Sequence, residues 1–393
     1  MLNIFFIGLI SFFTDISTEM VYPLIPLYLV GTFGATHALV GIIEGIAESL
    51  ASLLKIYSGY LTDKFQKKKL IAFSGYVPGL IYKLALIFAG SWVGILAARV
   101  IDRAGKGIRT SPRDVLVSES TDKDNMGKAF GLHKALDMFG AGLGILILYL
   151  IIRNSGAADG DYDYKRLFAL SMIPAVLGLF MFIFVKEKKQ ARKEIKSVPF
   201  WKNIKNIDGQ LKLYLLVVFL FTLGNSSKAF LILRAKSAGF DEMTVILLFL
   251  LFHIFAAALS MPLGKLSDKI GRKHLLVPGY ITFALCYFGF AFASGKWQML
   301  VVFILFGVYT AMITGVERAF VAEIAPPQLK GTMLGLHSTA AGIALLPASI
   351  IAGLLWDMFG AAVPFIFGAS LSLIAAALLI IFMSPGKALH KTT

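Results

Sequence analysis

Segments of about twenty apolar residues recur along the whole chain and are separated by short polar connectors. An apolar helix of about twenty residues crosses the hydrocarbon core of a bilayer, so each segment predicts one membrane span. We therefore expect an all-α integral membrane protein with twelve transmembrane helices. Their approximate bounds are 4–31, 37–60, 70–90, 92–117, 127–152, 166–185, 212–234, 242–264, 274–294, 297–323, 330–356 and 361–383.

The composition agrees with a membrane location. Mean hydropathy is +0.77 and only 16% of residues are charged, against roughly 25% in soluble domains. The net charge of +15 does not predict a nucleic-acid partner, because most bases lie in connectors, where they act as topology signals. The first segment has neither a basic leader nor a small-residue cleavage site, so we expect a first span rather than a signal peptide. A single cysteine, Cys286, excludes a disulfide framework and a thiolate metal cluster.

The distribution of Lys and Arg predicts the orientation. Connector 186–212 holds nine of these residues, whereas connectors 31–38, 89–92 and 359–363 hold none. Basic connectors stay on the cytoplasmic side of a membrane. We therefore expect both termini and the long middle connector to face the cytoplasm.

The chain also repeats itself. Two motifs and one arginine recur at nearly one offset: GYLTDK at 59–64 and GKLSDK at 264–269, GKAFGLH at 127–133 and GTMLGLH at 331–337, and Arg113 and Arg318. Three separated features at an offset of 204 or 205 residues indicate two homologous halves. We expect a six-helix N-half at 1–185, a cytoplasmic linker at 186–211 and a six-helix C-half at 212–393. Because six is even, the halves run parallel.

The two copies of the repeated loop, 59–64 and 264–273, resemble the duplicated loop motif of the major facilitator superfamily. The resemblance extends over the whole chain through helix number, basic central linker and duplicated motif. It implies two six-helix bundles that rock about a central cavity in alternating access, and hence a secondary transporter rather than an enzyme. The first copy departs from the family pattern, with Phe65, Gln66 and Lys67 where a Gly-Arg pair is usual.

The loop motif predicts a cytoplasmic gate. A carboxylate at a helix end can pair with an arginine and stabilise the N-terminus of a neighbouring helix. Contacts of this kind would exist only while the cytoplasmic side is closed. The expected gate residues are Asp63, Lys64, Arg113, Asp268 and Arg272, whereas Lys67, Lys68 and Lys69 are expected to be solvated.

Residues 98–116 carry a row of charges within an apolar span. Arg99, Asp102, Arg103, Lys106, Arg109 and Arg113 recur at steps of three or four, which places them on one face of a helix. A charge that faces lipid costs several kcal/mol, so we expect this face to line the cavity between the halves. The alternative is that the end of the segment, at Arg113 and Asp114, extends into water.

Two pairs of acids could neutralise this row. Asp15 and Glu19, and likewise Glu44 and Glu48, lie four residues apart within apolar spans. Burial favours a neutral carboxyl group and a nearby guanidinium favours a charged one, so a moving arginine can change proton affinity. We therefore expect proton coupling within a cavity formed by Asp15, Glu19, Glu44, Glu48, Asp102, Arg103, Lys106 and Arg109.

The C-half carries fewer charges. At the repeat offset Glu48 corresponds to His253 and Lys106 to Ala311. We expect the C-half to supply shape and aromatic contacts, with substrate-binding candidates Lys228, His253, Glu317 and Arg318. His253 alone is compatible with a proton site, a metal ligand or a buried structural histidine.

The cargo stays open among three classes. Segments 102–114 and 131–137 are similar to a bacterial branch of the superfamily that includes nickel-resistance exporters. That resemblance implies export of a divalent transition metal across the bacterial inner membrane. Carboxylates and imidazoles can bind such ions, so Glu44, Glu48 and His253 are possible ligands. A small organic anion is an alternative, because Arg103, Lys106 and Arg109 favour carboxylates and phosphates. A drug/proton antiporter is another, although the usual Gly-Pro motif of the fifth span is missing.

We therefore expect a proton-coupled secondary transporter that exports a divalent metal or a small metabolite. It would act without a cofactor, and its partners would be its solute, protons and the bilayer. A monomer is the default expectation. A membrane receptor that does not transport is the alternative from another functional class.

Overall fold

The computed structural model describes residues 2–65, 67–121, 126–156, 161–187, 209–324 and 330–383. All regular secondary structure in these ranges is helical. In the N-half the helices are α1 (Leu2–Glu19), α2 (Leu24–Phe33), α3 (His37–Phe65), α4 (Lys68–Phe88), α5 (Trp92–Glu119), α6 (Met126–Ser155), α7 (Tyr164–Phe180) and the short 3-10 helix η2 (Met181–Phe184). In the C-half they are α8 (Gly209–Gly224), α9 (Ala229–Ser237), α10 (Glu242–Ile270), α11 (Arg272–Phe292), α12 (Lys296–Ile313), α13 (Val316–Ile324), α14 (Lys330–Phe359) and α15 (Val363–Phe382).

The twelve predicted spans are all helical. Among the described residues, 10 helical segments are long and apolar enough to cross a membrane, and several combine two helices, such as α1 with α2 and α8 with α9. The other two predicted spans are α3 and α5, which are 29 and 28 residues long and carry acidic and basic side chains in their interiors. The prediction of an all-α, twelve-span protein is confirmed.

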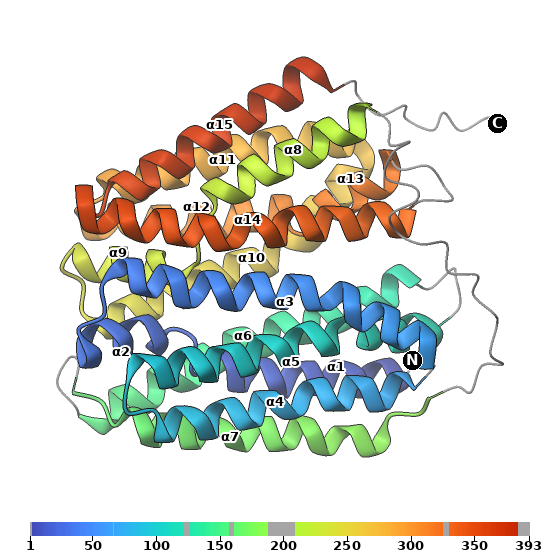
Figure 1. The fold of residues 1–393 in the computed structure, drawn as a ribbon, viewed down its shortest axis with the longest axis horizontal. Helices are drawn as coiled ribbons and strands as arrows, with labels where there is room; N and C mark the ends of the chain where they lie inside the picture. The colour runs from blue at the N-terminus through green and yellow to red at the C-terminus, as the bar shows by residue number, and fades with distance from the viewer. Residues whose placement is uncertain are drawn as a thin grey trace.

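The two halves lie one above the other in Figure 1, with α1 to α7 below and α8 to α15 above. They meet along three pairs of helices: α3 with α14, α6 with α10, and α2 with α9. Most of the predicted linker 186–211 falls outside the described residues, so its boundaries remain a prediction.

The first and seventh spans are interrupted at equivalent positions. α1 ends at Glu19 and α2 begins at Leu24, while α8 ends at Gly224 and α9 begins at Ala229, so both bounds are shifted by 205 residues. Pro23 immediately precedes the first residue of α2. Backbone N–H groups at the start of a helix have no hydrogen-bond acceptor within it, so the missing N–H of proline costs nothing there. The interruptions bring irregular backbone, and the side chains that it carries, to the boundary between the halves.

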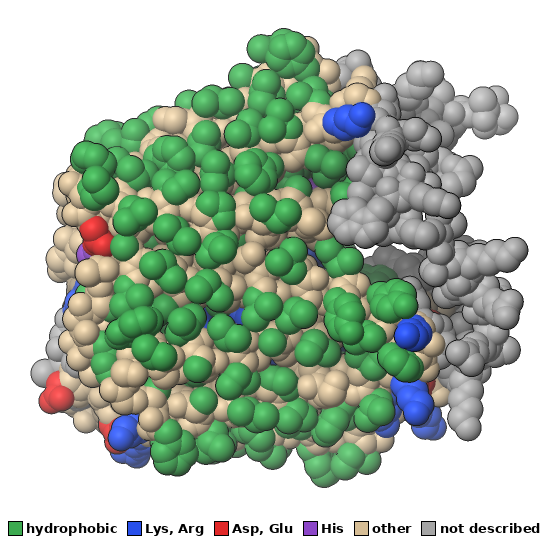
Figure 2. Space-filling model, in the orientation of Figure 1, with side chains coloured by type: hydrophobic (Ala, Val, Ile, Leu, Met, Phe, Trp, Pro, Cys, Tyr) green, Lys and Arg blue, Asp and Glu red, His purple; other side chains and the backbone are tan. Residues whose placement is uncertain are grey.

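The outer surface is apolar. Hydrophobic side chains cover most of the face in Figure 2, and the charged side chains of that face gather near the two ends of the helices. Large apolar residues such as Phe88, Met261 and Trp297 are more than half exposed. This surface suits contact with lipid, as expected for a multi-pass membrane protein.

Cysteine labelling can check the orientation predicted from Lys and Arg. Cys286 is fully buried, so an introduced cysteine reports its own side of the membrane. We expect Thr36→Cys, between α2 and α3, to react with a membrane-impermeant maleimide in intact cells. Lys67→Cys, between α3 and α4, should react only after permeabilisation. The reverse pattern would contradict the orientation.

Candidate functional site

The charged face of α5 pairs with acids of α3 and of α5 itself. Arg99 Nη2 lies 2.6 Å from Glu44 Oε1, and both side chains are 1% exposed. Arg103 Nη1 lies 3.2 Å from Glu48 Oε1. Asp102 Oδ2 lies 3.5 Å from Arg103 Nε and 3.9 Å from Arg99 Nη1. These residues form a network of opposite charges inside the protein rather than toward lipid, which is how buried charge becomes tolerable.

Tyr22 and Ser227 connect this network to the C-half. Tyr22 lies in the break between α1 and α2, with its ring centroid 5.4 Å from Arg99 Cζ. Its hydroxyl is 3.4 Å from the hydroxyl of Ser227, which in turn donates a hydrogen bond of 3.0 Å to Glu44 Oε2. Tyr22 and Ser227 are 205 residues apart, so the contact joins equivalent points of the two halves. Glu44 therefore binds groups from both halves.

A second polar contact between the halves involves Glu19 and His253. His253 Nε2 lies 4.0 Å from Glu19 Oε2, and its Nδ1 lies 2.9 Å from the carbonyl oxygen of Phe249. A carbonyl oxygen only accepts hydrogen bonds, so Nδ1 carries the hydrogen. A further proton on Nε2 would produce an imidazolium ion that faces the Glu19 carboxylate.

Two carboxyl groups meet between α1 and α6. The side chains of Asp15 and Asp137 are close neighbours, and Lys134 Nζ lies 2.6 Å from Asp137 Oδ2. Two neighbouring carboxylates repel each other unless one of them carries a proton. α1 and α6 can approach this closely because α6 has glycine at positions 140 and 144. A Cβ at Gly140 or Gly144 would collide with the backbone of α1. Asp15 is a predicted site residue, whereas its partner Asp137 is not.

Four lysines of the interior have no carboxylate within 4.0 Å among the described residues: Lys55, Lys83, Lys106 and Lys228. Lys83 of α4 is fully buried, and its Nζ has no hydrogen-bond partner in the described part of the chain. Lys228 lies just before α9, and its ammonium is 4.8 Å from the ring centroid of Phe252. The sequence did not identify Lys83 as a candidate site residue, because no acidic residue lies three or four positions away on the same helical face.

The predicted metal ligands do not come together. Glu44 and Glu48 are paired with different arginines, and His253 faces Glu19. Within the described ranges, no group of three His, Cys, Asp or Glu side chains is placed to hold a metal ion. Glu44, Glu48 and His253 are therefore not arranged as a common ligand set.

The predicted C-half candidates occupy two places. Lys228 and His253 lie near the centre, where each contacts an aromatic ring of α10. Glu317 of α13 instead accepts a hydrogen bond of 2.9 Å from the Tyr280 hydroxyl, and its Oε2 lies 3.8 Å from His337 Nε2. Arg318 is exposed.

The group of Tyr280, Glu317 and His337 has a counterpart in the N-half. There the hydroxyl of Ser11 lies 3.2 Å from the hydroxyl of Tyr76 and 3.0 Å from His133 Nε2. The two tyrosines, and likewise the two histidines, are 204 residues apart. Each half thus joins a tyrosine and a histidine through a third side chain, which is neutral in the N-half and acidic in the C-half.

The predicted gate residue Arg272 pairs within the C-half. Arg272 Nη2 lies 3.5 Å from Asp268 Oδ1, and Nη1 lies 2.9 Å from Glu323 Oε2. Nη1 also donates a hydrogen bond of 3.0 Å to the Ala319 carbonyl oxygen. The arginine therefore holds the start of α11 against α13, and Glu323 is a partner that the sequence did not indicate.

In the N-half, Lys68 and Glu119 form the equivalent ion pair, at an offset of 204 residues from Arg272 and Glu323. The expectation that Lys68 is solvated is wrong, since its side chain is 3% exposed and this acid neutralises it. Lys64 is exposed. The side chain of Asp63 lies outside the described part of the structure.

Arg113 lies at the same end of α5. Its Nη2 is 2.9 Å from Oδ1 of the adjacent Asp114, and the two side chains are 20% and 37% exposed. This placement agrees with the alternative that the end of the charged row reaches toward water.

At the opposite end of the molecule, α14 caps α3. The carboxylate of Asp357 accepts hydrogen bonds from the backbone N–H groups of His37, at 3.1 Å, and Ala38, at 2.8 Å. It also lies 2.8 Å from His37 Nδ1. Farther along, a Cβ at Gly41 would collide with the backbone of Ser349, so the two helices pack without an intervening side chain. This end, predicted to be extracellular, is closed by contacts between the halves.

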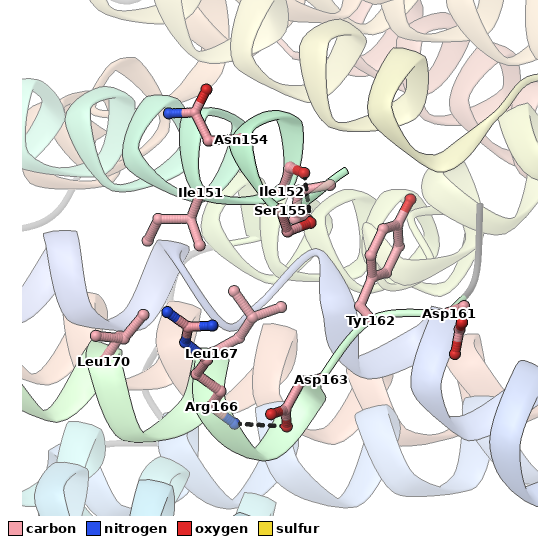
Figure 3. A pocket seen from close by; sticks show the side chains of 10 residues that line it. All are labelled: Ile151, Ile152, Asn154, Ser155, Asp161, Tyr162, Asp163, Arg166, Leu167 and Leu170. Atoms are coloured by element: carbon pink, nitrogen blue, oxygen red, sulfur yellow. Dashed lines mark hydrogen bonds between the residues drawn. The ribbon is translucent and has the colours of Figure 1, made fainter. Parts of the chain in front are cut away.

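A separate pocket of about 580 Å³ lies between the neighbouring ends of α6 and α7. Figure 3 shows Asn154 and Ile151 on one side, and Arg166 beside Asp163 on the other. Asp163 accepts a hydrogen bond of 3.0 Å from the Arg166 backbone N–H and so caps α7. None of the predicted site residues lines this pocket.

Twelve spans in two homologous halves, with ion pairs along the boundary, are the features of a membrane transporter. The sequence profile of the Major Facilitator Superfamily matches residues 7–233 and 213–393. An uncharacterized MFS-type transporter of Methanocaldococcus jannaschii is 35% identical over 389 residues, which cover 96% of this chain and 94% of that protein. The chain therefore belongs to the major facilitator superfamily, as the duplicated loop motif predicted.

Other similarities are more distant. A multidrug resistance protein of Proteus mirabilis is 30% identical over 136 residues, 35% of this chain and 34% of that protein. Among solved structures, a nucleoside transporter variant superposes with a TM-score of 0.82 at 11% identity, covering 97% of this chain and all of the other. A D-xylose-proton symporter superposes with a TM-score of 0.80 at 16% identity, and 98% of each chain is covered. These structures establish the fold.

The buried ion pair should matter for stability. Arg99→Ala leaves the Glu44 carboxylate buried without its base, and we expect a loss of about 3–5 kcal/mol. Thermal unfolding of the purified protein in detergent measures this loss. Combining Arg99→Gln with Glu44→Gln removes both charges and should destabilise less than Arg99→Ala alone. A wild-type unfolding temperature for Arg99→Ala would show that Glu44 does not need this base.

The contact of Asp357 with α3 should hold one side closed. We expect Asp357→Ala to raise maleimide labelling of Ser349→Cys from outside by about tenfold, because interactions of this kind bias conformational equilibria by about 1–3 kcal/mol. Asp163→Ala is the matched control, since Asp163 caps α7 within its own half. Equal labelling of the two variants would show that Asp357 only caps a helix.

Proposed function

We propose that the protein is a proton-coupled secondary transporter that exports a small solute across the plasma membrane by alternating access. Family membership supports transport, and the partial similarity to multidrug resistance proteins supports export. The surplus of Lys and Arg in alternate connectors supports cytoplasmic termini. A small metabolite fits the charged centre better than a metal ion, because Glu44 and Glu48 are each neutralised by an arginine.

The observation that supports proton coupling is the proximity of the Asp15 and Asp137 side chains between α1 and α6. Two neighbouring carboxyl groups in a helix bundle are more stable when one of them holds a proton. Because Lys134 neutralises Asp137, we assign that proton to Asp15. Both side chains are partly exposed, so neither is sealed within the helix bundle.

Loss of that proton would change the packing of α1 against α6. Two adjacent carboxylates repel, so loss of the proton would push α1 and α6 apart. α6 also packs against α10 of the C-half. A shift of α6 on deprotonation would therefore reach the boundary between the halves, which is the motion that alternating access requires.

The test uses the purified full-length protein. A thermal-shift screen against divalent metals, organic anions and cationic drugs selects a cargo, and flux is then measured in proteoliposomes with an imposed pH gradient. We expect Asp15→Asn and Asp137→Asn to reduce gradient-driven flux at least about tenfold, because each removes a proton-transfer partner. Exchange of labelled for unlabelled cargo, which needs no net proton movement, should persist.

Asp163→Asn serves as the control, because Asp163 is an aspartate outside the charged centre. Flux of the wild-type protein that ignores the pH gradient would overturn proton coupling. Cargo binding without any flux would indicate a receptor rather than a transporter.

A further inference from the structure

We propose that Lys106 and Lys228 together bind an anionic group of the cargo, a carboxylate or a phosphate, between the two halves. The proposal rests on the proposed transport function and names the chemical class of the solute. It differs from the sequence-based alternative, in which Arg103 and Arg109 accompanied Lys106.

The structure separates bases that are engaged from bases that are free to bind. Arg103 is paired with Glu48 and Asp102. Arg109 is only 6% exposed, with its Cζ atom 4.6 Å from the ring centroid of Tyr76, so a solute cannot reach it. In contrast, neither Lys106 nor Lys228 has a carboxylate oxygen within 4.0 Å in the described ranges. The two lysines therefore hold charge that no protein group neutralises directly.

Both lysines lie within the membrane-spanning part of the chain. Lys106 is 14 residues from the first residue of α5, Trp92, or about 21 Å along the helix. Lys228 precedes α9, whose 9 residues span about 13 Å to the end of the helix. In a hydrocarbon core about 30 Å thick, both positions fall inside the core. Lys228 is nevertheless exposed, and Lys106 is partly exposed.

The lysines come from opposite halves, and Tyr22 connects their surroundings. Lys106 follows Arg103 by one turn of α5, and Arg103 Cζ lies 5.9 Å from the ring centroid of Tyr22. The Tyr22 hydroxyl lies 3.4 Å from that of Ser227, which immediately precedes Lys228 in the break between α8 and α9. Two ammonium groups in an apolar surrounding repel unless an anion lies between them. A carboxylate or a phosphate would relieve this repulsion and would join the two halves.

The acids nearby do not replace such an anion. Glu48 is paired with Arg103, and Glu19 lies beside His253. Neither carboxylate has an oxygen within 4.0 Å of the ammonium group of Lys106 or Lys228. The Lys228 ammonium lies 4.8 Å from the ring centroid of Phe252, and the residue is exposed, so an anion can approach the side of the ammonium that the ring does not cover.

Binding to the purified full-length protein tests this site. The probes are acetate, succinate, inorganic phosphate and glycerol 3-phosphate, with glycerol and a quaternary amine as neutral and cationic comparisons. We expect at least one anion to raise the unfolding temperature in a saturable way. Lys106→Gln and Lys228→Gln should each weaken its apparent affinity about tenfold or more, because a charged hydrogen bond contributes about 1.5–3 kcal/mol.

Two further variants separate charge from structure. Lys228→Arg keeps the charge and should retain most of the affinity. Lys296→Gln removes an exposed lysine at the end of α12 and should leave binding unchanged. A preference for carboxylates over phosphates, or the reverse, identifies which anionic group is recognised.

The outcomes distinguish this proposal from the proposed function. Proton-driven flux of a neutral or cationic compound that does not depend on either lysine overturns the anion site and leaves proton-coupled transport in place. Lysine-dependent binding of an anion without flux retains the site and overturns transport. Anion binding that is equally strong in Lys106→Gln, Lys228→Gln and the wild type also overturns the site.

Discussion

The structure depends on the neutralisation of buried charge between α3 and α5. The pair of Glu44 and Arg99 is almost fully buried, so each group would be strongly destabilising without the other. Glu44 also accepts the hydrogen bond of Ser227 from the C-half. One carboxylate thereby fixes the position of α3 against α5 and contacts the irregular segment between α8 and α9. If the two halves separate at this point, the hydrogen bond between Ser227 and Glu44 must break.

A symmetric scaffold carries asymmetric chemistry. The breaks in the first and seventh spans, and the ion pairs that join α4 to α5 and α11 to α13, recur at a nearly constant offset. Ion pairs of the interior concentrate in the N-half instead. Where the N-half joins Tyr76 and His133 through Ser11, the C-half uses Glu317. Duplication preserved helix packing, which depends on shape, while individual polar side chains diverged.

The site that we propose for the proton and the site that we propose for the cargo occupy neighbouring parts of this scaffold. Asp15 and Asp137 lie between α1 and α6, and α6 packs against α10. α10 carries Phe252 and His253, which contact Lys228 and Glu19 respectively. A change in the acid pair is therefore one helix contact away from the lysines to which we assign the anion. This continuity is a physical route for coupling, because close-packed helices move as units.

The spans, the repeat and the charged face of α5 follow from sequence alone, because apolar length and helical spacing are local properties. The acids at positions 44 and 48 could likewise be assigned as partners of α5 from charge balance. Only the tertiary structure decided which groups meet. Ser227 reaches Glu44 across 183 residues and Asp357 reaches His37 across 320, and no local pattern encodes such pairs. The same holds for Asp137, and for the lysines that remain unpaired, because pairing depends on how helices from both halves pack in space.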